Sequence, residues 1–177
     1  MPPPDITLRK AVPGDENALG AVGAATFMES YPEIIDGKAI VDHSQNQHAP
    51  AIYRSYLSAQ DPRYACWLAE YTATGAPIGY AVNCPPDLPI DLQDGDIELK
   101  RIYVFSRFHG SGAGKQLGAL AIKHARALNA PRLLVGVYGE NHRAVAFYRR
   151  EGFAEIGTRQ FQVGDELYDD IIMAKTL

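Results

Sequence analysis

A glycine-rich loop followed by a helical pattern is the segment that most clearly indicates chemistry. The stretch SRFHGSGAGKQLGALAIKHA (residues 106–125) has Gly110, Gly112 and Gly114 at alternate positions. Because glycine has no Cβ, successive backbone N–H groups in such a loop can point into one concavity. The helix N-terminus adds unpaired N–H groups and the positive end of the helix dipole. This arrangement favours a bound pyrophosphate, to which Lys115 adds a positive charge.

Two common phosphate-binding loops do not fit this spacing. The P-loop pattern G-x-x-x-x-G-K-[ST], aligned on Gly114 and Lys115, needs a glycine at His109 and a hydroxyl at Gln116. The dinucleotide pattern G-x-G-x-x-G needs its third glycine at Lys115 or Leu117. On the loop alone, two alternatives stay open: a pyrophosphate site of another type, and a glycine-rich turn without a ligand.

Two further motifs flank the loop. IELKRIYV (residues 97–104) precedes it, and NHRAVAFYRREGF (residues 141–153) follows it. Together the three segments resemble the GNAT superfamily of N-acetyltransferases. That family has a strand of ELxRIYV type, a loop of [RQ]-G-x-G-x-[GA] type and a later N-x-x-A-x-x-F-Y-x-x-x-G-F motif. The resemblance covers most of the chain and implies that the loop binds the pyrophosphate of acetyl-CoA.

The resemblance also implies which residues contact acetyl-CoA. In the family, backbone groups at the end of the fourth strand pair with the pantetheine arm, and an asparagine contacts the same arm. The implied set is Ile102, Tyr103, Val104, His109, Gly110, Ser111, Gly112, Ala113, Gly114, Lys115 and Asn141. Asn141 is also a good N-cap for the helix after it, and the two roles are compatible. His109 departs from the family's Arg or Gln, which affects a side-chain contact but not the backbone N–H groups.

Transfer of an acetyl group to an amine needs a base and an acid. An alkyl amine has a pKa of roughly 10 and is mostly charged at neutral pH, so a carboxylate acting through water has to remove its proton. The resemblance implies Glu98 as this base, with Asp94 and Asp96 as competitors. The alternatives for Glu98 are a solvated strand-end glutamate and a glutamate paired with Lys100. It implies Tyr148 as the acid that protonates the departing thiolate, the alternative being core packing beside Phe147.

A narrower resemblance concerns the acceptor. The segments ATFMESY, GDIELKRIYV, LLVGVYGENHRAVAFY and VGDELYDDIIMAKTL are similar to PaiA-type bacterial acetyltransferases, a subfamily associated with spermidine and spermine. This implies a small primary amine, and specifically a polyamine, as the acceptor. Acidic residues that could attract a polycation are Glu29, Glu33, Asp36, Asp91, Asp94 and Asp96. The alternatives are an acetyltransferase for protein N-termini or lysines, and a catalytically silent acyl-CoA-binding sensor.

A mixed sheet is needed to bring these motifs together. The hydrophobic pattern predicts the order β-α-α-β-β-β-α-β-α-β-β, in which residues 97–138 form a strand, a helix and a parallel strand. The other strands can pair as antiparallel hairpins. We therefore expect a mixed α/β fold of GNAT type, with a mostly antiparallel sheet, one splayed parallel pair and flanking helices. The polar stretch from Pro32 to Pro50 is predicted to be a loop, and residues 1–177 to form a single acetyltransferase domain.

Composition and charge limit the kinds of ligand and metal site that we expect for this protein. The net charge of −4 argues mildly against nucleic acid. Cys66 and Cys84 lie in apolar stretches and indicate buried thiols, and no histidine has metal-site spacing, so we expect no metal. His43 and His48 are expected to be solvated.

The N-terminal segment MPPPDITLRK has no signal-peptide core, and no run in the sequence reaches the ~18 apolar residues of a membrane span. We expect a cytoplasmic protein with acetyl-CoA and a small amine as partners, a homodimer as the assembly to test, and neither nucleic acid nor a membrane.

Overall fold

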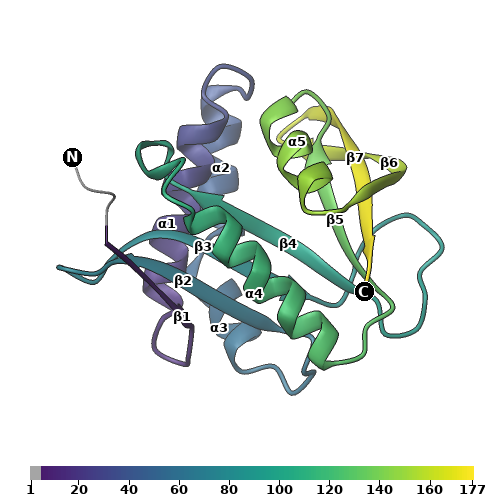
Figure 1. Cartoon of the computed structure of the whole chain (residues 1–177). Coiled ribbons are helices and arrows are strands. Elements are labelled where there is room, and N and C mark those ends of the chain that lie inside the picture. The colour runs from purple at the N-terminus through teal and green to yellow at the C-terminus, as the bar shows by residue number, and fades with distance from the viewer. Residues whose placement is uncertain (1–4) are drawn as a thin grey trace.

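The computed structural model describes residues 5–177 and contains a seven-stranded sheet flanked by helices (Figure 1). In chain order, the elements are β1 (Ile6–Lys10), α1 (Glu16–Ser30), α2 (Gly37–Gln47), α3 (Pro50–Leu57), β2 (Ala65–Tyr71), β3 (Ala76–Cys84), β4 (Ile97–Val104), the 3-10 helix η1 (Ser106–Phe108), α4 (Ala113–Ala127), β5 (Arg132–Tyr138), α5 (His142–Arg150), β6 (Ala154–Val163) and β7 (Glu166–Thr176).

The sheet has the mixed topology expected from the sequence. Its strands follow the order β1-β2-β3-β4-β5-β7-β6. Each neighbouring pair is antiparallel except β4 and β5, which are parallel. The crossover between these two strands is α4, because parallel neighbours need a long connection that returns the chain to the same edge. The predicted fold class is confirmed.

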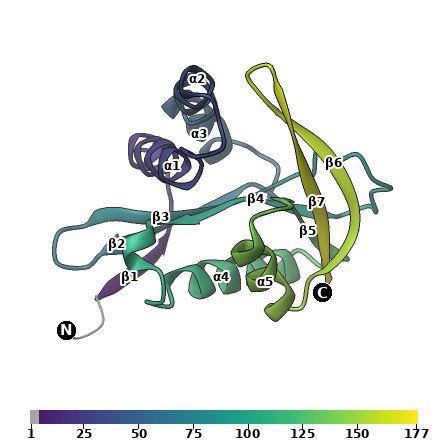
Figure 2. The same ribbon diagram turned by 90° about the horizontal axis from the view of Figure 1, so that it is seen from above.

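Helices cover both faces of the sheet (Figure 2). Helices α4 and α5 lie on one face, and α1, α2 and α3 lie on the other. On the α4 face, Leu117 and Ala121 are fully buried in the largest apolar cluster together with Ile97 and Leu133. Burying a leucine or isoleucine side chain is worth ~1.5–3 kcal/mol, so this cluster fixes α4 and the loop before it against β4 and β5.

Strands β4 and β5 are joined only at one end. Their register pairs Ile97 with Leu133 and Glu98 with Leu134, and beyond that point the strands separate (Figure 1). The β4 residues after Glu98 keep β3 as a partner on their other edge. Backbone N–H and C=O groups on the edge facing β5 therefore lack a strand partner there, and an extended ligand can pair with them.

A β-bulge at Lys100 changes which way β4 side chains point. Val82 pairs with Arg101 and Asn83 with Leu99, so Lys100 is an extra residue between them. Since side chains alternate along a strand, the extra residue moves Arg101 away from the face on which Leu99 packs. Arg101 and Tyr103 consequently lie on the face covered by α1, α2 and α3.

The stretch from 32 to 50 is not the loop that its polarity predicts, because it contains α2. Asp36 caps this helix, accepting hydrogen bonds from the N–H groups of Lys38 (2.9 Å) and Ala39 (3.2 Å). The buried side chain of Ile40 packs in one cluster with Val163, at the end of β6. The prediction was wrong because this apolar partner lies far along the sequence, where no local pattern reveals it.

Candidate active site

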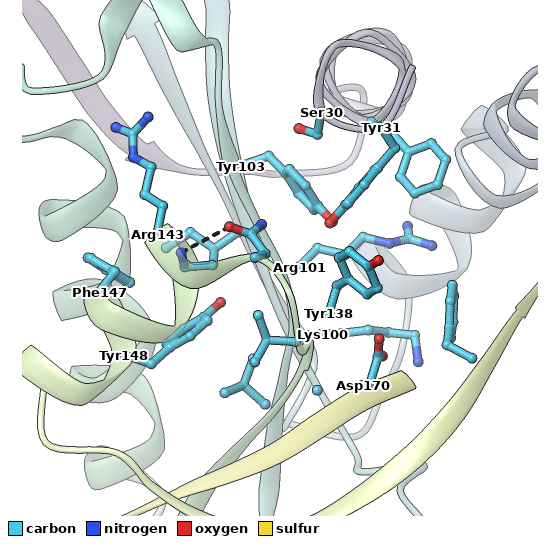
Figure 3. A pocket seen from close by; sticks show the side chains of 18 of the residues that line it. Ser30, Tyr31, Lys100, Arg101, Tyr103, Tyr138, Arg143, Phe147, Tyr148 and Asp170 are labelled. Atoms are coloured by element: carbon cyan, nitrogen blue, oxygen red, sulfur yellow. Dashed lines mark hydrogen bonds between the residues drawn. The ribbon is translucent and has the colours of Figure 1, made fainter. Parts of the chain in front are cut away.

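A cleft of about 1030 Å³ opens where β4 and β5 separate. Its walls come from both sides of the sheet: β4, β5, the loop before α4 and helix α5 on one side, and the end of α1, part of α2 and the β6–β7 hairpin on the other (Figure 3). The cleft therefore brings together all three of the motifs that the sequence singled out.

The glycine-rich loop reaches the cleft through its backbone. Gly110 and Gly112 have φ angles of 85° and 89°, a left-handed conformation that side chains other than glycine rarely adopt. Gly112 is the N-cap of α4, and the first N–H groups of a helix have no partner within it. Gly110, Gly112, Gly114 and Lys115 all line the cleft. Free N–H groups, a helix N-terminus and a lysine thus meet there, as an anion site requires.

Two residues of the same loop, Ser111 and Ala113, make local contacts at the start of α4. The Ser111 hydroxyl accepts a hydrogen bond from the N–H of Ala113 at 3.3 Å. The side chain of Ala113 is buried in the cluster under α4. Neither residue lines the cleft, because the Ser111 hydroxyl bonds the Ala113 N–H and the Ala113 side chain faces the core.

His109 connects the loop to α5. Its Nε2 bonds the Val104 carbonyl at 2.8 Å, and its Nδ1 bonds the guanidinium of Arg143. Because arginine can only donate, this pattern assigns the neutral imidazole with its proton on Nε2. His109 thereby holds Arg143 beside the glycine-rich loop. The sequence did not single out this cation, since its role depends on a contact between segments 34 residues apart.

The end of β4 forms the centre of the cleft. Ile102, Tyr103 and Val104 line it, on the stretch of β4 that has already separated from β5. The carbonyl of Val104 accepts from His109 and keeps a second lone pair. The hydroxyl of Tyr103 meets that of Tyr31, the residue after α1, at 3.2 Å across the cleft (Figure 3).

Helix α5 contributes Asn141 and Tyr148. Asn141 caps the helix by accepting from the N–H of Ala144 at 3.0 Å, and it also lines the cleft. The ring of Tyr148 is 5% exposed and packs edge-on against Phe153, while its hydroxyl points into the cleft (Figure 3). Burial raises the pKa of this hydroxyl above its ordinary value of 10, so it stays protonated at neutral pH. Phe147 lines the cleft beside it.

Glu98 is the predicted base that lies in the cleft. Its carboxylate is almost fully buried, accepts from the N–H of Asp87 at 2.9 Å and lies 4.0 Å from the Lys100 ammonium. Its predicted competitors lie elsewhere. Asp96 is buried in an ion pair with Arg132 at 2.5 Å, and Asp94 is exposed outside the cleft.

The acidic residues expected to attract a polycation do not line the cleft. Asp36 caps α2, and Glu29 accepts from the N–H and hydroxyl of Ser106, both at 2.8 Å. Asp96 is paired internally, and Glu33, Asp91 and Asp94 are exposed on the outer surface. Hydrogen bonding to backbone groups and internal pairing thus account for three of these carboxylates, and we correct the expectation that the six residues attract a polycation into the cleft.

The side of the cleft opposite to Tyr148 is built around Arg101. Its guanidinium donates to the Tyr53 hydroxyl at 3.1 Å and lies over the Tyr53 ring. The Tyr53 hydroxyl bonds His48 Nδ1 at 2.8 Å. Burial, followed by the charge of Arg101, lowers the pKa of His48 to about 3 and that of His43 to about 4. Both histidines are therefore neutral at pH 7, and His48 is buried, which corrects the expectation that they are solvated.

Another arginine that lines the cleft, Arg159, has a carboxylate partner. Arg159 on β6 pairs with Asp170 on β7 at 3.0 Å. A Cβ on Gly136 would lie 2.7 Å from the Arg159 guanidinium, so glycine at this point of β5 lets the side chain cross the strands into the cleft. Burial raises the pKa of Asp170, although Arg159 partly offsets this.

The remaining observations concern metal sites, membrane spans and the two cysteines. Within residues 5–177, no group of three or more His, Cys, Asp or Glu side chains is placed to hold a metal ion. The same range has no helix with the length and apolar character of a membrane span. Cys66 and Cys84 are free and buried, in agreement with the sequence prediction.

Comparisons with known proteins give the chain's relatives. Residues 25–153 match the model of the acetyltransferase (GNAT) family. An uncharacterized N-acetyltransferase of Mycobacterium tuberculosis is 32% identical over 163 residues, which is 92% of this chain and 98% of the relative. The spermine/spermidine N(1)-acetyltransferase of Bacillus subtilis is 28% identical over 86 residues, 48% of this chain and 57% of that protein. The crystal structure of PaiA N-acetyltransferase from Thermoplasma acidophilum with coenzyme A has a TM-score of 0.79 at 19% identity, covering 98% and 99% of the two chains, which supports the fold alone.

Proposed function

The chain belongs to the GNAT family of acetyltransferases, and we propose that its cleft binds acetyl-CoA and transfers the acetyl group to the primary amine of a small acceptor. One observation carries this proposal. The glycine-rich loop follows directly on the strand whose edge opens away from β5, so an anion site and an unpaired strand edge are continuous in one cleft. We take residues 1–177 as one domain with this activity.

The cleft residues fit acetyl-CoA segment by segment. N–H groups of the loop from Gly110 to Lys115, with the charges of Lys115 and Arg143, would hold the pyrophosphate. The open edge of β4 from Ile102 to Val104 would pair with the pantetheine amides in the manner of an added strand. The Asn141 amide nitrogen is available to the same arm, because its oxygen is used in capping α5.

The chemistry then divides between Glu98 and Tyr148. Glu98, directly or through water, would take a proton from the amine, and the amine nitrogen would attack the thioester carbonyl. The C–N bond forms in this attack, and the C–S bond breaks as the tetrahedral intermediate collapses. The departing thiolate would take its proton from the Tyr148 hydroxyl, and the Tyr148 phenolate would recover a proton from the amide nitrogen, which has to lose its second proton. Glu98 would release the first proton to solvent. The Tyr148 hydroxyl is protonated at working pH, as a proton donor has to be, and its position in the cleft supports the role.

A polyamine acceptor is the narrower hypothesis. It is supported by similarity to the Bacillus subtilis spermine/spermidine acetyltransferase over about half of this chain. The charge in the cleft counts against it, because Arg101 lines the cleft without a carboxylate partner among residues 5–177, while none of the six expected acidic residues lines it. The carboxylates that do line the cleft are Asp170, paired with Arg159, Glu98, the proposed base, and the exposed Asp87. Charge therefore favours an acceptor other than a polycation.

A thiol-release assay tests the proposed function. Acetyl-CoA is incubated with the protein and with a panel of polyamines, amino acids, amino sugars and basic peptides, and free thiol is measured over time. We expect release that depends on an amine and an acetylated product of matching mass. Binding of acetyl-CoA without release from any amine would instead identify a sensor that has lost catalysis.

A further inference from the structure

We propose that the acceptor amine carries a carboxylate and that Arg101 binds this carboxylate. The inference rests on the proposed function and deepens it, because it names the class of amine that the cleft accepts. Arg101 leaves β4 on the side of the cleft opposite to Tyr148 (Figure 3). Within residues 5–177, no carboxylate oxygen lies within 4.0 Å of its guanidinium.

Neutral groups hold Arg101 in place. The bulge at Lys100 turns the side chain toward α3, where the guanidinium donates one hydrogen bond to the Tyr53 hydroxyl and lies over the ring, 5.4 Å from its centroid. The hydroxyl in turn bonds His48, which is uncharged. No other group in the described part of the chain accepts a hydrogen bond from the guanidinium side chain. Since arginine has five N–H donors, most of the N–H groups of this guanidinium remain free to bind a ligand.

The charges of the cleft leave Arg101 without a counterion. Asp170 is paired with Arg159 at 3.0 Å, and Glu98 has Lys100 at 4.0 Å. Asp87 is exposed at the rim. A half-buried cation that lacks a partner has lost hydration without compensation, and a ligand carboxylate restores it through two parallel N–H···O bonds. One uncompensated positive charge suits a carboxylate better than a phosphate, which carries nearly two negative charges.

The remaining lining describes the body of the acceptor. Aromatic side chains from the end of α1, β4 and the β6–β7 hairpin line the same cleft as Arg101, among them Phe27, Tyr31, Tyr103, Phe161 and Tyr168. These rings favour an apolar body. The acceptor class is therefore a small amino acid whose apolar part lies among the rings, with the carboxylate on Arg101 and the amine directed toward Glu98.

Matched inhibitors test the inference without depending on the identity of the amine. Acetate, butanoate, hexanoate and 3-phenylpropionate are each compared with their neutral primary amide, as competitors of the best acceptor in the thiol-release assay and as ligands in calorimetry with the acetyl-CoA-loaded protein. We expect at least one carboxylate to bind about 10- to 100-fold more tightly than its amide, the range of a hydrogen bond to a charged group.

The variant Arg101→Met provides the second part of this test. Methionine keeps the stem of the side chain, and Tyr53 keeps its hydrogen bond to His48, so we expect the fold and acetyl-CoA affinity to be retained. The preference for carboxylate over amide should disappear in this variant. Arg54→Met is the matched control, because Arg54 is an exposed arginine on α3 that pairs with Glu16 outside the cleft. It should leave the preference unchanged.

The outcomes separate the inference from the proposed function. Thiol release with spermidine as best acceptor, combined with no preference for any carboxylate over its amide, overturns the inference and leaves acetyl transfer standing. A carboxylate preference that survives Arg101→Met also overturns it. Absence of thiol release with every amine removes acetyl transfer, and the acceptor assignment with it.

Discussion

At the residue scale, the partners of the two groups proposed for proton transfer distinguish their roles. The hydroxyl of Tyr148, the proposed acid, stays protonated at neutral pH, and its ring is buried against Phe153. Glu98 is equally buried, but it retains a backbone N–H and a nearby ammonium as partners for its charged form. One site thus contains a group suited to donate a proton and a group suited to accept one.

Replacing Tyr148 with phenylalanine tests the donor role. The ring and its packing against Phe153 remain, and only the hydroxyl is lost. We expect kcat to fall by roughly 10²–10⁴-fold, as for other lost acid–base groups, with little change in the KM for acetyl-CoA. Because the pKa of Tyr148 is raised, the wild-type rate should also stay on its plateau up to pH values above 10. An unchanged kcat under conditions where chemistry limits turnover would assign the proton to another donor.

Arg143 should contribute to acetyl-CoA binding through charge. Its guanidinium is held at the loop by His109, so Arg143→Met should raise the KM for acetyl-CoA by about fivefold, the equivalent of ~1 kcal/mol, and leave kcat nearly unchanged. Arg149→Met is the control on the same helix, since Arg149 pairs with Glu155 at the surface. Equal changes in the KM for acetyl-CoA in the two variants would contradict a specific role of Arg143 in binding acetyl-CoA.

At the scale of elements, one β-α unit builds most of the site. The bulge in β4 directs Arg101 and Tyr103 to one face, the opening from β5 frees the strand edge, and the glycine-rich loop starts α4 where the strand ends. Each of these is a backbone feature. Substitutions that change backbone conformation or backbone access should therefore affect ligand binding more than they affect packing.

Alanine at Gly114 separates binding from folding. Gly114 lies within α4 with ordinary helical φ, and a Cβ there would meet nothing closer than Val104 at 4.0 Å. Gly114→Ala should therefore leave stability unchanged or raise it by up to ~0.5–1 kcal/mol, while the new methyl group in the cleft weakens acetyl-CoA binding. Chemical denaturation and calorimetry on the same variant measure the two effects. Gly112→Ala, where φ is 89°, should instead destabilise the fold by ~1–2 kcal/mol. Unaltered acetyl-CoA affinity in Gly114→Ala would show that phosphates do not approach this backbone.

The junction of α2 and α3 should make the fold sensitive to mild acid. The folded-state pKa of His48 is lowered to about 3, whereas the unfolded value is near 6.5. The unfolded chain therefore binds the proton first, and the stability contributed by neutral His48 is present above about pH 6.5 and is lost as pH falls toward 3. Between pH 6.5 and 5, the free energy of unfolding should decrease by up to ~1.4 kcal/mol per pH unit through this group. The variant His48→Gln should lack this part of the slope in denaturation at several pH values, and an identical slope would show that His48 titrates normally.

At the scale of the whole molecule, structural features that depend on nearby residues in the sequence were easier to predict than features that depend on long-range contacts. Alternate glycines before a helix and branched residues in strands are local, so the loop, α4 and the mixed sheet could be predicted from the sequence. Helix α2 could not, because Ile40 finds its apolar partner on β6. The direction of Arg101 depends on how β4 registers with β3, and the position of Arg143 depends on His109. The positions of these two arginines in the cleft were for these reasons not visible in the sequence.

The structure of the protein with coenzyme A bound tests the central claim most directly. The account predicts the pyrophosphate on the backbone N–H groups from Gly110 to Lys115, with Arg143 beside it. It also predicts the pantetheine arm along the edge of β4 that faces β5, and the thiol next to the Tyr148 hydroxyl. Coenzyme A bound with its pyrophosphate away from this loop, or with its arm outside the opening between β4 and β5, would contradict the account.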